Sequence, residues 1–224
     1  MCFSTVASFG AGVILSGAGI LAARKVTEPK QRMFAAIPAV FAIQQFTEGF
    51  VWLSLTQESY STWLRPAAFV FLFFAEVLWP LWIPMAVLRL ENNPQRKKIL
   101  LFLAGLGLVF ALHTLYYLLT NAFEAQLMDH HIKYKLHFPV PFILFTWSIY
   151  GILTILPTFI STVPKMWIVG LPMMASFFIA EILYPNYVIS VWCYFAAIIS
   201  IVVVIQQMEM SKTLLLQRKS TTGI

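Results

Sequence analysis

The sequence predicts an all-α, polytopic membrane protein, built as a bundle of about seven transmembrane helices. Of its 224 residues, 60% are hydrophobic and only 11% are charged, whereas soluble domains have about 45–50% apolar and about 25% charged residues. In lipid, long apolar runs without strand-like alternation must satisfy their backbone hydrogen bonds internally, so these runs are helices and not strands. Together these observations exclude a water-soluble globular fold.

Seven apolar runs of about 20 residues, each bounded by charged or turn residues, are the predicted spans. They are residues 3–23, 33–55, 66–88, 99–119, 142–161, 166–184 and 187–206. Residues 1–210 are therefore predicted to form a single transmembrane domain, and residues 211–224 a basic cytoplasmic tail.

The first run has no basic residue before it, and its basic residues follow within 24–32. A secretory signal peptide begins with basic residues, so this run is predicted to remain in the protein, with its amino terminus outside. Gly10 and Gly17, like Gly12 and Gly19, are seven residues apart and share a helix face. They are predicted to let a neighbouring helix approach closely.

The distribution of Lys and Arg tests the seven-span arrangement. Twelve of the 15 fall in segments predicted to be cytoplasmic, and three, Arg65, Lys133 and Lys135, fall outside. This bias follows the positive-inside rule and predicts a cytoplasmic carboxyl terminus. Because the basic residues lie at span ends, the net charge of +6 favours membrane lipids as partners, and nucleic acid is not expected.

Three acidic residues lie within predicted spans: Glu48, Glu76 and Glu181. A charge at the bilayer centre costs about 2.5–3.5 kcal/mol, so such residues face the bundle interior and mark function by default. With His113 and Cys193, they lie about 5–15 Å from the predicted outer ends at about 1.5 Å per residue. This common depth predicts a polar site in the outer half.

The second span carries the densest polar cluster. Gln44 and Gln45 precede Glu48 by four and three residues, so the three side chains share one helix face. This face is predicted to be polar and to point into the bundle. It is either part of a functional site or a hydrogen-bonded clamp between helices, and the sequence leaves both open.

Prolines predict irregular places in three of the spans. Pro80 and Pro84 lie in the third span, Pro157 in the fifth and Pro172 in the sixth. Each removes a helical hydrogen bond, so kinks are expected there.

In the last span, small residues recur at helical spacing. Ser190 is followed by Cys193, Ala197 and Ser200, at spacings of three, seven and ten residues from Ser190. This stripe either packs tightly against a neighbour or lines a narrow cavity.

The outer segment 120–138 is predicted to be a loop, and it holds Asp129, His130, His131 and Tyr134. Adjacent histidines point in different directions on any regular element, so at most one faces inward with Tyr134. An exposed, solvated histidine pair is the alternative.

Cys2 is expected at the outer end of the first span. Removal of Met1 would leave Cys2 with a free amine beside its thiol, a combination that chelates soft metals; a tip without function is the alternative. Cys2 and Cys193 are predicted to come close in space. Three outcomes stay open: a shared metal, a disulfide, or no contact.

Four motifs spread over most of the chain carry a resemblance to a known family. They are Met1-Cys2-Phe3-Ser4 followed by Ala7-Ser8-Phe9, Gln45-x-x-Glu48-Gly49-x-Val51-Trp52, Asp129-His130-His131-x-x-Tyr134, and Ser190-x-Trp192-Cys193-x-x-Ala196-Ala197-x-x-Ser200. Together they resemble an uncharacterised family of bacterial seven-span membrane proteins that open with MCFS. The resemblance implies a multi-pass protein of the bacterial inner membrane with these segments as its site, and it implies no reaction. Some members have His where this chain has Gln44.

The residue patterns and the resemblance select overlapping residues for a metal site. Its predicted ligands are Cys2, Glu48, His130, His131 and Cys193. Thiolate, imidazole and carboxylate in a partly dry site suit a zinc or copper ion, and two sulfurs favour the softer ions. No motif indicates an organic cofactor.

The expected function is therefore an outward-facing metal site, with Glu48 as catalytic base if the protein is a membrane metalloenzyme. The alternative is a transporter, or a sensor that takes a small molecule or metal from the outer side. In either case further polar residues are expected to line the cavity. They are Gln44, Gln45, Glu76, His113, Tyr134, Glu181 and Ser190.

Overall fold

The fold is mostly helical. The computed structural model describes residues 4–128, 131–136 and 143–222. Within these ranges, five helices are long and apolar enough to cross a membrane, and two further apolar helices are shorter. The five are Thr5–Arg24, Pro29–Thr56, Glu58–Leu90, Pro94–Thr120 and Val188–Thr213, and the two are Thr146–Ile160 and Trp167–Leu183.

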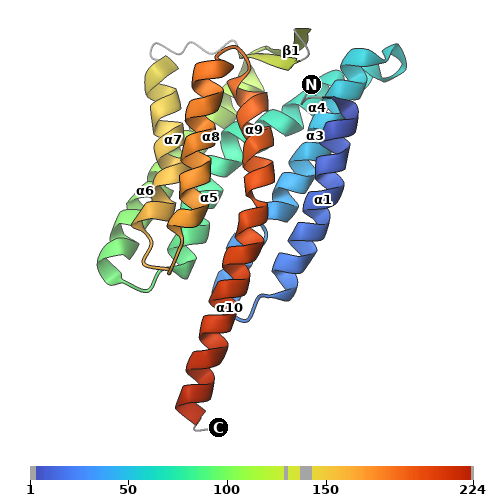
Figure 1. The fold of residues 1–224 in the computed structure, drawn as a ribbon. Coiled ribbons are helices and arrows are strands. Elements are labelled where there is room, and N and C mark those ends of the chain that lie inside the picture. Colours follow the sequence, from blue (N-terminus) through green and yellow to red (C-terminus); the bar gives the residue numbers. More distant parts are fainter. Residues whose placement is uncertain (1–3, 129–130, 137–142, 223–224) are drawn as a thin grey trace.

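These segments follow one another along the chain, and the segment between α6 and α7 contains a β-hairpin (Figure 1). The first half contains α1 (Thr5–Arg24), η1 (Pro29–Gln31), α2 (Arg32–Ala35), α3 (Ile37–Thr56), η2 (Glu58–Trp63), α4 (Leu64–Leu72), η3 (Phe73–Leu78) and α5 (Trp79–Leu90). The second half contains α6 (Pro94–Thr120), β1 (Phe123–Met128), β2 (His131–Leu136), α7 (Ile143–Ile160), α8 (Trp167–Leu183), α9 (Val188–Ile199) and α10 (Ile201–Thr222).

The two ends of the bundle differ. The start of α1 lies at the same end as the β-hairpin, which we call the hairpin end. The carboxyl terminus lies at the opposite end, which we call the tail end, and α10 projects beyond the bundle there (Figure 1). Because α10 is helical as far as Thr222, no change of secondary structure marks the predicted start of the tail at residue 211.

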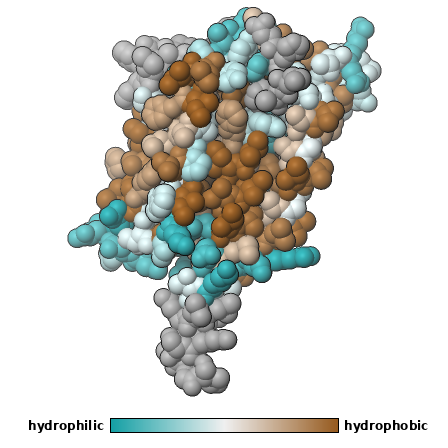
Figure 2. Space-filling view, in the orientation of Figure 1, coloured by the Kyte–Doolittle hydropathy of each residue, from teal (hydrophilic) through white to brown (hydrophobic). Residues whose placement is uncertain are grey.

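The surface between the two ends is apolar. Large hydrophobic side chains are exposed on several helices, among them Val6, Phe102 and Ile182. Figure 2 shows hydrophobic residues over the middle of one face and hydrophilic residues gathered toward its ends. An exposed apolar band of this kind is suited to lipid and unsuited to water.

The predicted loop at 120–138 contains an antiparallel hairpin instead. β1 pairs with β2 in a register that places Ala125 opposite Tyr134 and Met128 opposite His131. Ile132 and Tyr134 are buried, whereas Lys135 is exposed. This period-two alternation is typical of a half-buried strand, but it is too short to indicate a strand from the sequence alone.

Pro80 has the clearest structural consequence among the prolines. The six residues before α5 form the π-helix η3. In a π-helix the Pro80 nitrogen would pair with the carbonyl of Ala75, but proline has no N–H to donate. Tyr150 Oη donates to that carbonyl from α7, so the lost bond is replaced by one between helices.

One of the two glycine pairs of α1 makes the predicted close approach. Gly12 faces the ring of Phe46, and Gly19 faces the backbone of Ala39, both on α3. No heavy atom lies within 4 Å of where a Cβ would stand at Gly10 or Gly17. Of the two pairs, Gly12 and Gly19 allow the close packing of α1 on α3, and Gly10 and Gly17 do not contribute to it.

A carboxylate holds two connections together at the tail end. Glu91 is buried and accepts from the backbone N–H groups of Asn92 and Asn93, each at 2.8 Å. Thr162, between α7 and α8, donates its N–H at 2.6 Å and its hydroxyl at 2.5 Å. Burial raises the pKa of Glu91, but these hydrogen bonds outweigh it and lower the pKa from 4.5 to about 2.

Glu91→Gln is expected to lower the free energy of unfolding by about 2 kcal/mol at pH 7, because the charge-assisted bonds are weakened. A folded pKa below the unfolded value means that the stabilisation is present above about pH 4.5 and is lost as the pH falls toward 2. In detergent, the thermal unfolding temperatures of the variant and the wild type should therefore become equal as the pH falls toward 2. Glu58→Gln, at an exposed carboxylate, is the control and should leave the unfolding temperature unchanged at every pH.

Candidate functional site

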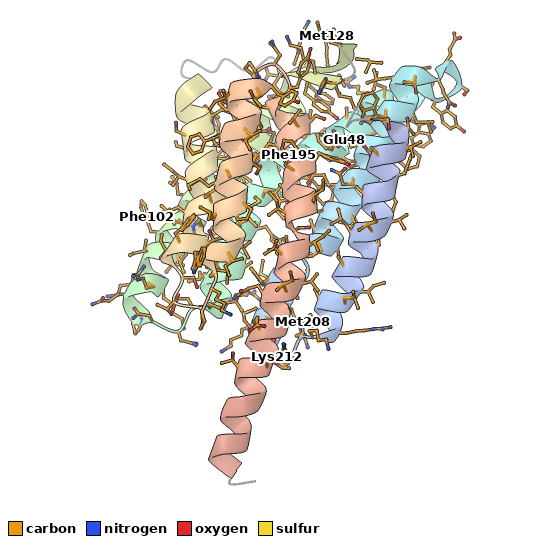
Figure 3. All side chains as sticks on the ribbon, in the orientation of Figure 1. Glu48, Phe102, Met128, Phe195, Met208 and Lys212 are labelled. Carbon is orange, nitrogen blue, oxygen red and sulfur yellow. The ribbon has the colours of Figure 1, made fainter. Side chains whose placement is uncertain are left out.

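The predicted polar face of α3 is buried. Gln44, Gln45 and Glu48 have no exposed surface. Gln45 Nε2 donates to Glu48 Oε2 at 3.4 Å, in keeping with their spacing of three residues on one helix. Figure 3 shows Glu48 toward the hairpin end of the bundle.

The stripe of small residues on α9 supplies the partner from across the bundle. Ser190 Oγ donates to Glu48 Oε1 at 2.5 Å and is itself 1% exposed. Cys193, three residues later, is buried. Its thiol is close enough to Glu48 and Glu76 to interact electrostatically with both carboxyl groups. The structure therefore brings together the second and last predicted spans, as the expected site requires.

Trp79 of α5 contacts the buried polar face of α3. Its indole Nε1 donates to Gln44 Oε1 at 2.6 Å, and its ring stacks on Phe41 with centroids 3.9 Å apart. No feature of the sequence points to Trp79, because a Trp next to a proline within an apolar run carries no signal that indicates its partner. Tyr150, the donor to Ala75, was missed for the same reason.

Several buried polar atoms around Glu48 have no hydrogen-bond partner among the described residues. On α3 they are Gln45 Oε1 and Trp52 Nε1, and on β2 Tyr134 Oη. The Gln44 amide contacts the Cys193 thiol. An unpaired polar atom in an apolar interior is costly, and its retention is typical of a site that binds something else. We call Gln44, Gln45, Glu48, Tyr134, Ser190 and Cys193 the polar cluster.

Tyr134 connects this cluster to the hairpin end. Its ring stacks on Phe71 with centroids 4.9 Å apart, and it lies within electrostatic reach of Glu48 and Cys193. The same tyrosine lines a surface pocket of about 440 Å³ together with Trp147 of α7 and residues at the start of α9. Tyr134 thus stands between the surface pocket and the buried carboxyl group.

On the opposite side of the cluster the interior is apolar and narrow. A cavity of about 20 Å³ borders Cys193 and Trp79, and a second of about 20 Å³ shares Phe41 and Met173 with it. Each has room for about one water molecule. Neither offers a polar route toward the tail end.

The structure separates other predicted site residues from the cluster. His131 stacks on Tyr187 with centroids 4.8 Å apart. In strand β2 it faces the side opposite Tyr134, because the two are three residues apart. His113 is exposed on α6 and contacts Tyr117.

The other two carboxyl groups in the predicted spans are not bonded to Glu48. Glu76 is buried in η3, and it lies within electrostatic reach of Cys193 and Tyr150. Glu181 is partly buried near the end of α8, and its Oε2 has no hydrogen-bond partner among the described atoms. Glu76 therefore borders the cluster, whereas no described contact joins Glu181 to it.

Two predicted metal ligands, Cys2 and His130, lie outside the described residues. Among the residues that the structure describes, no three side chains of His, Cys, Asp or Glu converge closely enough to hold a metal ion. Of the five predicted ligands, the structure brings together Glu48 and Cys193.

Comparison with known proteins places the chain in a family. The chain belongs to DUF6629. This is a family of unknown function, and its model matches residues 1–217. No curated protein and no solved structure matches the chain. The predicted membership of an uncharacterised family is thereby confirmed, and the family's description assigns no activity to the polar cluster.

Ser190→Ala is expected to lower the free energy of unfolding by about 1–2 kcal/mol, because Glu48 Oε1 loses its donor from α9. Ser200→Ala is the matched control. Ser200 is equally buried near the end of the same helix, but its hydroxyl donates to the carbonyl of Ala197 within its own turn. Thermal unfolding of both purified variants in detergent measures the difference, and equal losses would contradict an interhelical role for Ser190.

Proposed function

We propose that the protein is a seven-span membrane protein that binds a cation from the outer side, at the polar cluster around Glu48. The observation that carries this proposal is a buried carboxyl group with neutral partners only. Within the described residues, no Lys, Arg or His forms an ion pair with Glu48 or Glu76. A carboxyl group at such depth is either protonated or matched by a cation.

The surrounding atoms support a ligand at this position. Gln45 Oε1 and Tyr134 Oη are buried oxygen atoms without a hydrogen-bond partner in the described structure. Both can face a cation beside Glu48, and the Cys193 thiol adds a soft donor. The pocket lined by Tyr134 supports entry from the hairpin end.

A zinc or copper ion is the cation that the donor set favours. Carboxylate and thiolate together suit these metals, and a thiolate weighs against magnesium or calcium. The described residues supply two ligands, Glu48 and Cys193, so Cys2 and His130 are proposed as the others. His131 is left out of this set because it stacks on Tyr187 on the far face of β2.

A membrane metalloenzyme is the first reading of such a site. A bound metal would supply an activated water or a polarised substrate group, and Glu48 would then hold or take the proton. Substrates would be lipids or solutes of the outer side. The narrow apolar cavities beyond Cys193 support this reading over transport, because an ion would find no polar path through them. A metal or ligand sensor is the alternative that uses the same cluster.

We place the hairpin end outside and the tail end in the cytoplasm of the bacterial inner membrane. The five long and two shorter apolar helices sum to the seven proposed spans. Twelve of 15 basic residues fall on the proposed cytoplasmic side. The carboxyl terminus at the opposite end from the start of α1 fits an odd number of spans.

The metal content of the purified full chain in detergent tests the cation site. Elemental analysis is expected to find about one zinc or copper ion per chain. Glu48→Gln and Cys193→Ser should each lose most of it, because each removes a proposed ligand while keeping its size. His131→Asn is the control and should retain the metal. Wild-type protein that stays metal-free after incubation with both ions would overturn the metal site.

Reporter fusions test the orientation independently of the metal. A reporter joined after Ile224 is expected to be active only as a cytoplasmic fusion, and one joined after Thr120 only as an outside fusion. Both expectations follow from the charge bias. A carboxyl-terminal fusion that reports from the outside would overturn the proposed orientation and place the polar cluster on the cytoplasmic side.

A further inference from the structure

A second pocket, of about 430 Å³, lies at the tail end, far from the polar cluster. Four segments that are distant in sequence form its walls: η1 with Lys30, the end of α5 with Leu90, the connection between α7 and α8 with Lys165, and α10 with Glu209. The pocket has basic residues on two walls. Leu90, Val163 and Met210 give it an apolar part as well.

Lys165 adopts a backbone conformation that lysine rarely takes. Its φ is 62°, and it is the one non-glycine residue with positive φ in the described part of the chain. The Met166 N–H donates to the Val163 carbonyl at 3.2 Å, which makes residues 163–166 a turn with Pro164 second and Lys165 third. A turn with proline second and positive φ third normally has glycine or asparagine at that third position. Lysine therefore carries a conformational cost here that glycine would avoid, and costs of this kind are retained mainly at functional sites.

The positive charge at the pocket exceeds the negative charge. Lys165 Nζ lies 4.0 Å from Glu209 Oε2, and Lys212 Nζ lies 3.7 Å from Glu209 Oε1, so one carboxylate faces two ammonium groups. Lys30 pairs with Glu28 at 3.0 Å. All three pairs are solvent-accessible, and such pairs are weak enough to yield to a stronger anion.

The walls of the pocket are held in place without any ligand. Gln206 Nε2 donates to the Pro164 carbonyl at 2.7 Å, which fixes the turn to α10. Thr162 is bonded twice to Glu91. Gln31 Oε1 accepts from the backbone N–H of Thr27 at 2.8 Å, which fixes the wall near Lys30. A preorganised pocket with a basic rim and an apolar part suits a ligand with one anionic and one apolar portion.

We propose that this pocket binds an anionic phospholipid, with the phosphate between Lys30 and Lys165 and the apolar portion against Val163 and Met210. The location supports a lipid, since the tail end is where apolar helix surface gives way to polar residues. Basic pockets at such boundaries between membrane helices bind anionic headgroups. This site does not depend on a metal at Glu48, and it does not require the cytoplasmic assignment of the tail end.

The test compares lipid retention by the purified full chain in mixed micelles of equal amounts of phosphatidylglycerol and phosphatidylcholine. Mass spectrometry of the lipid that copurifies should show wild type enriched in phosphatidylglycerol. Lys165→Gly should reduce the enrichment at least threefold, because the ammonium group is lost. The same variant should match or exceed wild type in thermal unfolding temperature without lipid, because glycine accepts the positive φ.

Lys30→Gln should reduce the enrichment likewise, and Lys98→Gln, an exposed lysine outside the pocket lining, should leave it unchanged. Equal effects of the Lys98 and Lys165 variants would show general surface attraction and overturn the pocket. Absence of enrichment in wild type would overturn it too. A free-phosphate site would give a different result: millimolar inorganic phosphate would displace the lipid and would bind equally well in lipid-free detergent. Such a site needs no acyl chain, and this result would overturn the lipid assignment.

Discussion

Glu48 is the group on which the arrangement of the hairpin half depends. A carboxyl group with no exposed surface requires hydrogen-bond partners in an apolar interior, and one helix cannot provide enough of them. The second donor, Ser190, comes from 142 residues further along the chain. Satisfying this one group therefore fixes α9 against α3. Cys193, one helical turn later on the same face of α9, is brought close to the carboxyl group as a consequence.

The parts of the site that depend on helical periodicity could be predicted from the sequence. The common face of Gln44, Gln45 and Glu48 follows from spacings of three and four residues, and the α9 stripe follows in the same way. The choice of partner could not be predicted. Nothing in the spacing of Trp79 indicates that its indole meets Gln44, because that contact depends on how α5 packs on α3. Periodicity describes one helix, whereas partner choice depends on two.

The hairpin shows how a local error changes a predicted site. In the predicted loop, either His130 or His131 could face inward with Tyr134. On a strand, side chains alternate between the two faces, so His131 lies on the face opposite Tyr134 and stacks on Tyr187. Similarly, Pro80 correctly predicted an irregular third span, but not that the irregularity is a π-helix whose free carbonyl is satisfied by Tyr150. In both cases the residue types were informative, and the geometry that connects them was not in the sequence.

Glu48 and Glu91 are both buried, but they differ in how many hydrogen bonds they accept. Both carboxyl groups are buried, yet Glu91 accepts four hydrogen bonds, and a carboxylate has about four lone-pair positions. Both oxygens of Glu91 are engaged, Oε1 by three donors and Oε2 by one, and its role is to hold the connections at the tail end. Glu48 accepts two, one of them long at 3.4 Å, and unpaired donors and acceptors lie around it. It is this remaining capacity, more than burial, that makes Glu48 the centre of a binding site.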